Sequence, residues 1–263
     1  MKNLLARWGV TLSLVGTTLL GTVALTSMQA RALPEQDVVE KLRPVPVFTV
    51  TNAEGAPLVV EVADEENQAS IVGVFISKQA AEAYVQRLKS QNLEVGNAVQ
   101  VVPLSLGEIY QRSQQNNEDR IVFELVPVRA QVDAALSLLR QEGQEVERFP
   151  GVPLFFARGG EDGGFLTVQR GENQVVPFFF NKEDLQVLLD KLKETNHNQI
   201  PNIEIDVVNL LQVIRTLKTK EDPQLNQVVL VPSRESVEYL RSLQSSQSSQ
   251  SSQSSQSSQN GNE

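Results

Sequence analysis

Few residues of this chain have the chemistry that catalysis or metal binding requires. The sequence contains no cysteine and one histidine, His197, which lies in the polar stretch TNHNQ at residues 195–199. Disulfides, thiolate metal ligands and cysteine nucleophiles are therefore excluded, and a zinc site or a Ser-His-Asp arrangement would depend on a single imidazole. Because this polar stretch joins a predicted helix to a predicted strand, we interpret His197 as a solvent-exposed loop residue.

Two further segments resemble ligand-binding loops but have simpler interpretations. Residues 159–164 (GGEDGG) lie between predicted strands, where glycines supply the positive φ angles of a turn. Residues 64–66 (DEE) lack the alternating ligand pattern of a calcium loop and are typical of a solvated acidic turn. Motifs of serine hydrolases, zinc proteases and P-loop proteins are absent from the sequence. We predict no enzymatic activity, no cofactor and no metal, although a carboxylate-pair hydrolase stays open, since the separation of acids is three-dimensional.

Composition places the chain among globular proteins with an acidic surface. It has 263 residues, a hydrophobic fraction of 40%, a charged fraction of 21% and a formal net charge of -9. These values allow a sizeable core in one large domain or two small ones. An acidic surface repels nucleic acid and anionic membranes, so we predict no nucleic-acid partner.

The two ends of the chain differ from its middle. Residues 1–30 have a basic start, an apolar run diluted by Thr and Gly, and small residues before a polar segment, the layout of a cleavable signal peptide. An uncleaved anchor helix is the alternative, since the apolar run is nearly long enough to span a membrane. Residues 31–43 are a predicted linker. Residues 244–263, which are mostly SSQ repeats, are predicted to be a disordered tail.

The middle of the chain is built twice. Residues 71–89 (IVGVFISKQAAEAYVQRLK) and 175–193 (VVPFFFNKEDLQVLLDKLK) each combine an apolar strand, a polar capping residue and apolar positions at helical spacing. Flanking segments match in the same order, which gives hairpin, strand, helix, strand, short helix, strand and helix in each copy. We therefore predict an α/β (α+β) fold of two modules, residues 44–147 and 148–243, related by a pseudo-two-fold axis. Each would have a mixed sheet of about five strands and three helices. In the first copy, residues 58–62 are expected to pair with the first strand as a hairpin.

Apolar surface is the most distinctive feature of the second copy. Two of its strands hold five of the ten phenylalanines of the chain. Successive side chains of a strand face opposite ways, so Phe178 and Phe180 share one face and Phe179 takes the other. Three short helices barely cover both faces of such a sheet, so an exposed apolar groove is an alternative to a closed core. The candidate residues of this groove are Leu154, Phe155, Phe178 and Phe180.

An ordered set of short motifs resembles one known family. The motifs are the duplicated V-P-[VL]-F at residues 45–48 and 152–155, F-x-[SN]-K at 75–78 and 179–182, and V-P at 126–127 and 231–232. Together they are similar to the TIC twenty-two family, the twenty-two-kilodalton component of the chloroplast inner-envelope translocon, in its cyanobacterial form. The resemblance covers residues 44 to about 243, and the SSQ tail lies outside the family pattern.

The resemblance implies a function without catalysis. It implies an exported, chaperone-like protein of the periplasm that binds unfolded or precursor polypeptides through apolar pockets on each side of a two-fold body. It further implies contact with the periplasmic domains of the outer-membrane barrel insertase, and no stable membrane insertion after signal cleavage. An alternative is a structural adaptor that docks on the insertase and binds no client. The sequence leaves open whether export ends in the periplasm or in the thylakoid lumen.

Overall fold

The computed structural model describes residues 33–64, 67–91, 93–115, 121–159, 163–195, 203–220 and 223–257. The predicted signal peptide, His197, Glu65 and Glu66 lie outside these residues. Within the described part of the chain, no helix combines the length and the apolar character that a membrane span requires.

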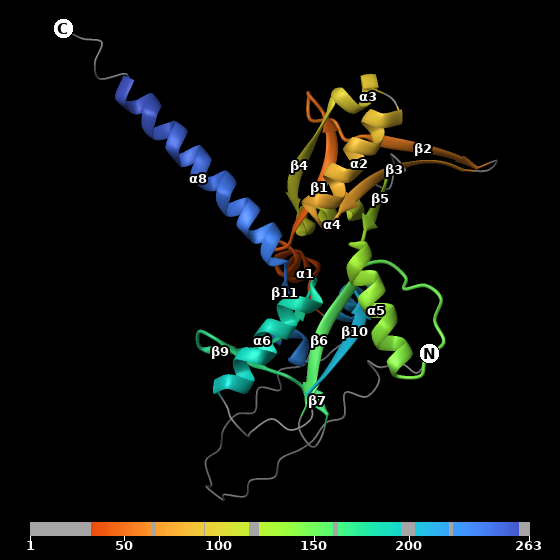
Figure 1. The fold of residues 1–263 in the computed structure, drawn as a ribbon, viewed down its shortest axis with the longest axis vertical. Coiled ribbons are helices and arrows are strands. Elements are labelled where there is room, and N and C mark those ends of the chain that lie inside the picture. The colour runs from red at the N-terminus through yellow and green to blue at the C-terminus, as the bar shows by residue number, and fades with distance from the viewer. Residues whose placement is uncertain are drawn as a thin grey trace, which may run out of the picture.

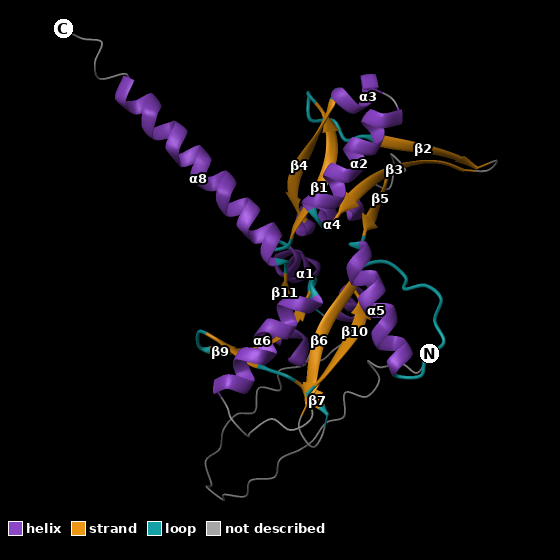
Figure 2. Cartoon of the chain, in the orientation of Figure 1, coloured by secondary structure: helices purple, strands orange, loops and turns teal. Residues whose placement is uncertain are grey.

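Most helices and strands follow the predicted order in both copies (Figures 1 and 2), but the predicted linker at residues 31–43 contains helix α1 (Glu35–Leu42), whose Val38 and Leu42 are buried in the core. After α1, the first copy comprises β1 (Pro46–Asn52), β2 (Val59–Asp64), β3 (Asn67–Phe75), α2 (Lys78–Gln91), α3 (Leu93–Asn97), β4 (Val99–Ser105), α4 (Leu106–Gln115), β5 (Ile121–Val126) and α5 (Arg129–Gln141). The second comprises β6 (Pro153–Gly159), β7 (Gly164–Phe165), β8 (Val168–Arg170), β9 (Asn173–Phe179), α6 (Lys182–Thr195), β10 (Glu204–Asn209), α7 (Leu210–Thr219), the 3-10 helix η2 (Pro223–Gln227), β11 (Val228–Val231) and α8 (Arg234–Ser257).

Each copy forms its own sheet, and the two sheets have the same topology. The central order is β4-β1-β3-β5 in the first sheet and β10-β6-β9-β11 in the second, with one parallel pair in each, β3 with β5 and β9 with β11. The registers also agree, because Phe48 faces Phe75 in the first sheet as Phe155 faces Phe179 in the second. The predicted duplication and the mixed α+β class are confirmed.

The expected hairpin partner of β1 is wrong. Strand β2 pairs antiparallel with β3, from Val59 opposite Val72 to Asp64 opposite Asn67. Only the bond from the Leu58 amide to the Val50 carbonyl, 2.8 Å, and an isolated bridge join this segment to β1.

Polar residues at the strand ends begin the short helices α4 and α7. The Ser105 hydroxyl accepts a hydrogen bond from the Gly107 amide, and the Glu108 carboxylate accepts one from the Ser105 amide, which together form a capping box. Its counterpart Asn209 caps α7 by accepting a bond of 2.7 Å from the Leu211 amide. These caps fix where each short helix leaves its sheet.

The two sheets share one core between them. Their inner faces pack together with α1, α4 and α7, and this cluster includes Val47, Val74, Phe156, Phe178 and Leu210. Each sheet has a second apolar cluster on its outer face. The molecule is therefore layered as outer helices, sheet, shared core, sheet and outer helices.

The last helix of each copy covers the outer face of the other copy's sheet. Helix α5 follows β5 but packs beside β6 and β10 (Figure 1), where Ala135 and Leu138 join the outer cluster of the second sheet. Helix α8 follows β11 but contacts β1, where the ring of Tyr239 lies 5.8 Å from that of Phe48. This exchange was not expected, since we assigned residues 44–147 and 148–243 to separate modules.

The predicted disordered tail is wrong as far as Ser257. Helix α8 runs from Arg234 to Ser257 and projects away from the two sheets (Figure 1). Its start is anchored by Ser236, which is 2% exposed, and by Tyr239. A helix satisfies its backbone groups internally, and neither Pro nor Gly interrupts the Ser-Gln repeats before Ser257, so the helix continues beyond the packed part. Residues 258–263 lie outside the described residues.

Candidate functional site

The four predicted client-binding residues lie in the core. Leu154, Phe155, Phe178 and Phe180 have exposed fractions of 0, 0, 2 and 4%. Phe178 and Phe180 belong to the shared core, whereas Phe179 faces the outer cluster, as strand alternation predicts. These four residues therefore belong to a closed core, not to the exposed groove that the sequence left as an alternative, because α5 and α6 cover one face of the second sheet and the shared core with α1 and α7 covers the other.

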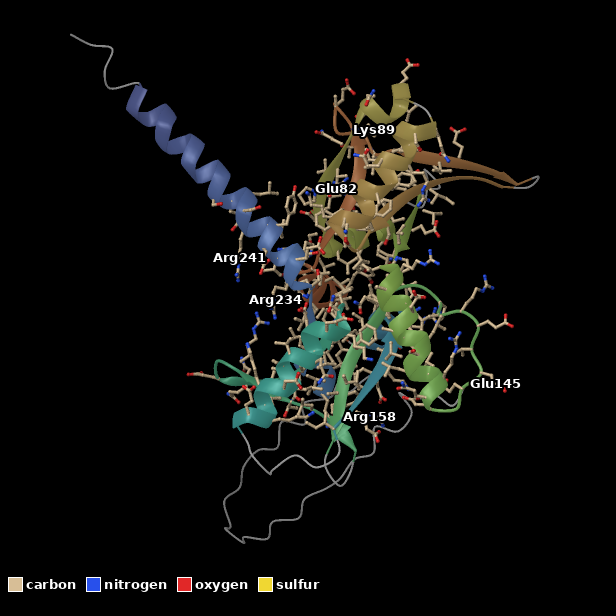
Figure 3. The ribbon with its side chains drawn as sticks, in the orientation of Figure 1. Glu82, Lys89, Glu145, Arg158, Arg234 and Arg241 are labelled. Atoms are coloured by element: carbon tan, nitrogen blue, oxygen red, sulfur yellow. The ribbon has the colours of Figure 1, made fainter. Side chains whose placement is uncertain are left out.

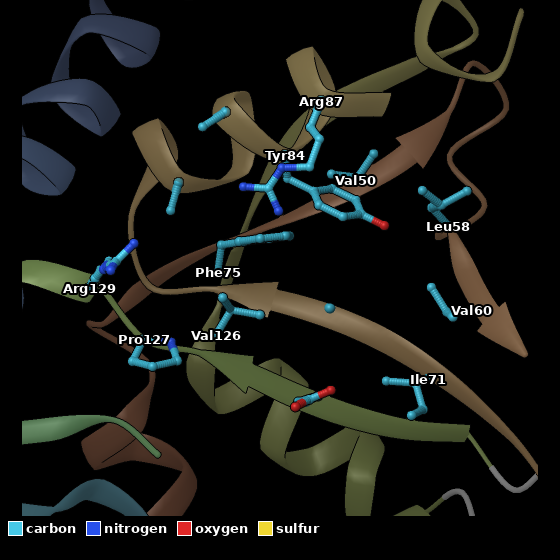
Figure 4. A pocket seen from close by; sticks show the side chains of 14 residues that line it. Val50, Leu58, Val60, Ile71, Phe75, Tyr84, Arg87, Val126, Pro127 and Arg129 are labelled. Atoms are coloured by element: carbon cyan, nitrogen blue, oxygen red, sulfur yellow. The ribbon is translucent and has the colours of Figure 1, made fainter. Parts of the chain in front are cut away.

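An apolar groove instead opens on the outer face of the first sheet (Figure 4). Its volume is about 610 Å³. Strands β1, β2, β3 and β5 form its floor, helix α2 forms one wall, and the start of α5 reaches its edge. The lining residues are Val50, Leu58, Val60, Ile71, Gly73, Phe75, Ala80, Ala83, Tyr84, Arg87, Glu124, Val126, Pro127 and Arg129. We call this cavity the first groove.

Small side chains keep the first groove open. Ile71, Gly73 and Phe75 alternate along β3 and share the outer face, so Gly73 leaves a gap in the floor between two large residues. A Cβ atom at Gly73 would lie 3.4 Å from the Phe75 ring. On the facing wall, α2 presents Ala80 and Ala83. The groove therefore exists because three small residues stand where larger ones would close it.

Aromatic and aliphatic surface reaches solvent in the first groove. The rings of Phe75 and Tyr84 lie 5.4 Å apart, and Tyr84 is half-buried. Val60 is 48% exposed at the opposite side. Figure 4 shows these side chains around one hollow, with Tyr84 on the helix and Val60 on the strand across from it. Such a surface can hold an apolar side chain of about the size of a leucine or phenylalanine.

A second groove lies at the equivalent place on the second sheet. Its volume is about 620 Å³. Seven of its lining residues match lining residues of the first groove in sequence and register: Val175, Pro177, Phe179, Leu188, Val229, Val231 and Pro232. Its floor is less accessible, because Val175 and Pro177 are buried whereas Ile71 and Gly73 are half-buried. Residues of α1 and α8 also line it.

The two grooves have the same balance of charged lining residues. The first contains Arg87, Arg129 and Glu124, and the second contains Lys41, Arg170 and Glu40. In the second, Lys41 donates from Nζ to the carbonyl oxygens of Asn226, at 2.9 Å, and Val228, at 3.0 Å. Burial lowers the pKa of Lys41, and the charge of Asp37 only partly opposes this shift.

One cluster of charges lies outside both grooves, where α5 ends against β6 and β10. Arg158 and Asp206 form an ion pair, with Asp206 almost fully buried (Figure 3 shows Arg158). Burial, together with a hydrogen bond to Asp206 and its charge, raises the pKa of Glu142 at the end of α5. Among the described residues, no three His, Asp or Glu side chains are grouped in a way that would hold a metal ion.

Sequence reasoning missed the first groove because it searched for aromatic residues. The relevant signal is a comparison of the copies, in which Gly73 stands where the second copy has Pro177, and Ala80 where it has Asp184. Both substitutions alter side-chain size at positions that face outward. Conspicuous phenylalanines marked the core instead.

Comparison with known proteins gives a consistent result. The family model described as the Tic22-like family matches residues 6–242. The chain is 25% identical over 220 residues to the chloroplast protein TIC 22 of Pisum sativum, which covers 84% of this chain and 81% of that protein. It is 26% identical over 200 residues to the chloroplast protein TIC 22 of Arabidopsis thaliana, which covers 76% and 68% of the two chains.

Two solved structures have the same fold. Tic22 of Anabaena, described as a protein-transport protein, superposes with a TM-score of 0.71 at 40% identity, which covers 80% of this chain and 97% of that chain. Tic22 from Plasmodium falciparum superposes with a TM-score of 0.63 at 22% identity, which covers 79% and 97%. The second similarity concerns the fold alone.

Proposed function

Because the chain belongs to the Tic22-like family, we propose that it is a chaperone-like transport factor that holds unfolded or precursor polypeptides in the first groove. The observation that carries this proposal is an open apolar groove with a solvent-accessible aromatic wall. Binding would bury an apolar segment of the client reversibly, and the acidic exterior would keep the loaded complex soluble.

The proposal also includes the compartment, the client and the partner of the protein. The predicted signal peptide would deliver the protein to the periplasm, and the client would be an outer-membrane precursor passed to the periplasmic domains of the barrel insertase. No catalytic step is needed, since the bound client leaves unchanged. Family membership in protein transport and the groove support this role, and they support the adaptor alternative less, because an adaptor needs no apolar groove.

Filling the first groove tests the proposal. In the Gly73→Leu variant, the new side chain would occupy the gap beside Phe75. Gly73 does not have a positive φ, and strand β3 accepts a branched apolar residue, so we expect the fold to be retained. Light scattering of an aggregating unfolded client would measure protection, and thermal unfolding would measure stability.

The matched control is Gly164→Leu, because Gly164 is exposed, lacks a positive φ and has nothing within 4 Å of an added Cβ. We expect Gly73→Leu to require several times more protein than this control for the same protection. Equal protection by both variants would rule out the first groove as the binding site. Failure of the unmodified protein to protect, together with capture of the insertase domains in a pull-down, would favour the adaptor.

A further inference from the structure

The first groove carries two positive charges that form no ion pair among the described residues. Figure 4 shows Arg87 on α2 beside Tyr84 and Arg129 near Pro127, with Leu58, Val60 and Ile71 on the far side of the hollow. Both residues are exposed, and neither forms an ion pair with any residue that the structure describes. Among the described lining residues, Glu124 has the one carboxylate. The groove therefore combines an apolar floor with two guanidinium groups.

The second copy neutralises the equivalent arginine. Arg234, the counterpart of Arg129 at the start of its helix, receives the carboxylate of Asp184, whose Oδ2 accepts a bond of 3.0 Å from the Arg234 amide. The Arg234 Nε atom lies 3.8 Å from Asp184 Oδ1. The first copy has Ala80 in place of Asp184. The same fold thus pairs this arginine internally in one copy and leaves it facing the groove in the other.

We propose that the first groove selects apolar polypeptide segments flanked by Asp or Glu. This inference rests on the function proposed above and names the class of segment that the groove takes. The apolar side chain of the client would enter the hollow above Gly73, between Phe75 and Tyr84. Flanking carboxylates would accept hydrogen bonds from Arg87 and Arg129, whose planar guanidinium groups suit that geometry.

Charge complementarity favours this occupant over a basic segment. The protein as a whole has a net charge of -9, so its long-range field attracts basic chains to any part of the surface. At contact distance, however, a basic flank would meet two guanidinium groups and one carboxylate in the groove. Like charges opposed in this way disfavour binding, whereas opposite charges fix the register of the bound segment.

Three peptides with one apolar centre test the inference. The centre is the same short Leu-Phe segment, flanked by Glu in one peptide, Ser in the second and Lys in the third, with both ends blocked. Because its carboxylates would form two exposed ion pairs with the groove, we expect the Glu peptide to bind about fivefold more tightly than the Ser peptide. We expect the Lys peptide to bind most weakly, and the differences to shrink in high salt. Fluorescence anisotropy of labelled peptides measures the affinities.

The doubly substituted variant Arg87→Glu, Arg129→Glu should reverse this order. Its control changes the exposed helical residues Arg112 and Arg215, which do not line the groove, in the same way and so has the same net charge. An unchanged order in the groove variant, or a reversed order in the control, would overturn the inference.

Two other outcomes distinguish a failure of the charge selectivity from a failure of the proposed binding function. Equal binding of all three peptides, lost in Gly73→Leu, would leave the groove as a binding site and overturn its selectivity. Binding of none of them would contradict the proposed function as well. Concentration-dependent self-association of the protein alone, abolished by Gly73→Leu, would identify a second copy of the chain as the occupant and overturn both proposals.

Discussion

The outer faces of the two sheets have the same backbone plan and different surfaces. Both have a groove of similar volume in the same register. In the first, Ile71 and Gly73 are half-buried and Arg129 forms no ion pair among the described residues, whereas in the second Val175 and Pro177 are buried and Arg234 is paired with Asp184. The cavity is thus present in both copies, and a few outward-facing substitutions change its floor and the pairing of one arginine.

The largest effect should come from the aromatic core of the second copy. Phe178 is 2% exposed and its ring lies 4.9 Å from that of Phe156. Phe178→Ala should lower the free energy of unfolding by about 3–5 kcal/mol, through lost burial and a cavity in the shared core. Denaturant unfolding measures this change, and Tyr84→Ala in the open groove is the comparison. A smaller loss for Phe178→Ala than for Tyr84→Ala would reverse our assignment of core and site.

The exchanged helices should make the two sheets unfold together. Tyr239 of α8 packs on Phe48, and Lys78 Nζ lies 4.5 Å from the centre of the Tyr239 ring. Tyr239→Ala should cost about 2 kcal/mol, from an aromatic contact and a cation–π contact together. We expect one unfolding transition with a lowered midpoint, seen equally by circular dichroism and by tyrosine fluorescence. Two separated transitions would mean that the sheets are independent.

Transferring the acid of the second copy to the first should reduce the charge selectivity. Ala80→Asp places a carboxylate where Asp184 stands, so Arg129 would be paired as Arg234 is. We expect the preference for the Glu-flanked peptide over the Ser-flanked peptide to fall about twofold, the size of one exposed ion pair. Peptide binding measures this ratio, and Gln79→Asp, at an exposed position of α2 that does not line the groove, is the control. No difference between the two variants would argue against pairing with Arg129.

The smallest effect concerns pH. Partial burial and the neighbouring Asp206 raise the pKa of Glu142, so the folded state binds this proton more tightly than the unfolded chain does. Stability from this group therefore increases as the pH falls through the raised pKa, and the unfavourable contribution is present above it. Glu142→Gln should raise the melting temperature at pH 7 by about 1 °C or less and weaken its pH dependence. A lower melting temperature at pH 7 would contradict the assigned environment.

Sequence reasoning predicted the elements well, because their signals are local. The apolar strands and the helical spacing in residues 71–89 and 175–193 are short-range patterns, and the repeat reinforced each of them. It was harder to predict which strands pair and which sheet each helix covers. Helical spacing shows that α5 has an apolar face, but not which sheet that face covers, and alternation in β2 does not choose between β1 and β3.

The candidate site was still harder to predict, because the first groove exists where side chains are small. Gly73 and Ala80 carry no chemistry that draws notice, and their effect depends on the neighbours that the fold provides. The phenylalanines are conspicuous in the sequence, but large apolar side chains are most often buried, and these are buried too.

The exchange of α5 and α8 has a consequence for the order in which the chain folds. The Lys41 Nζ and the Asn226 carbonyl that join the two ends are 185 positions apart, and β1 receives the cover of α8 only from the far end of the sequence. Contacts over such distances close late. A partly synthesised chain can therefore pair the strands of its first sheet, but the outer face of that sheet stays partly uncovered until the last helix is available.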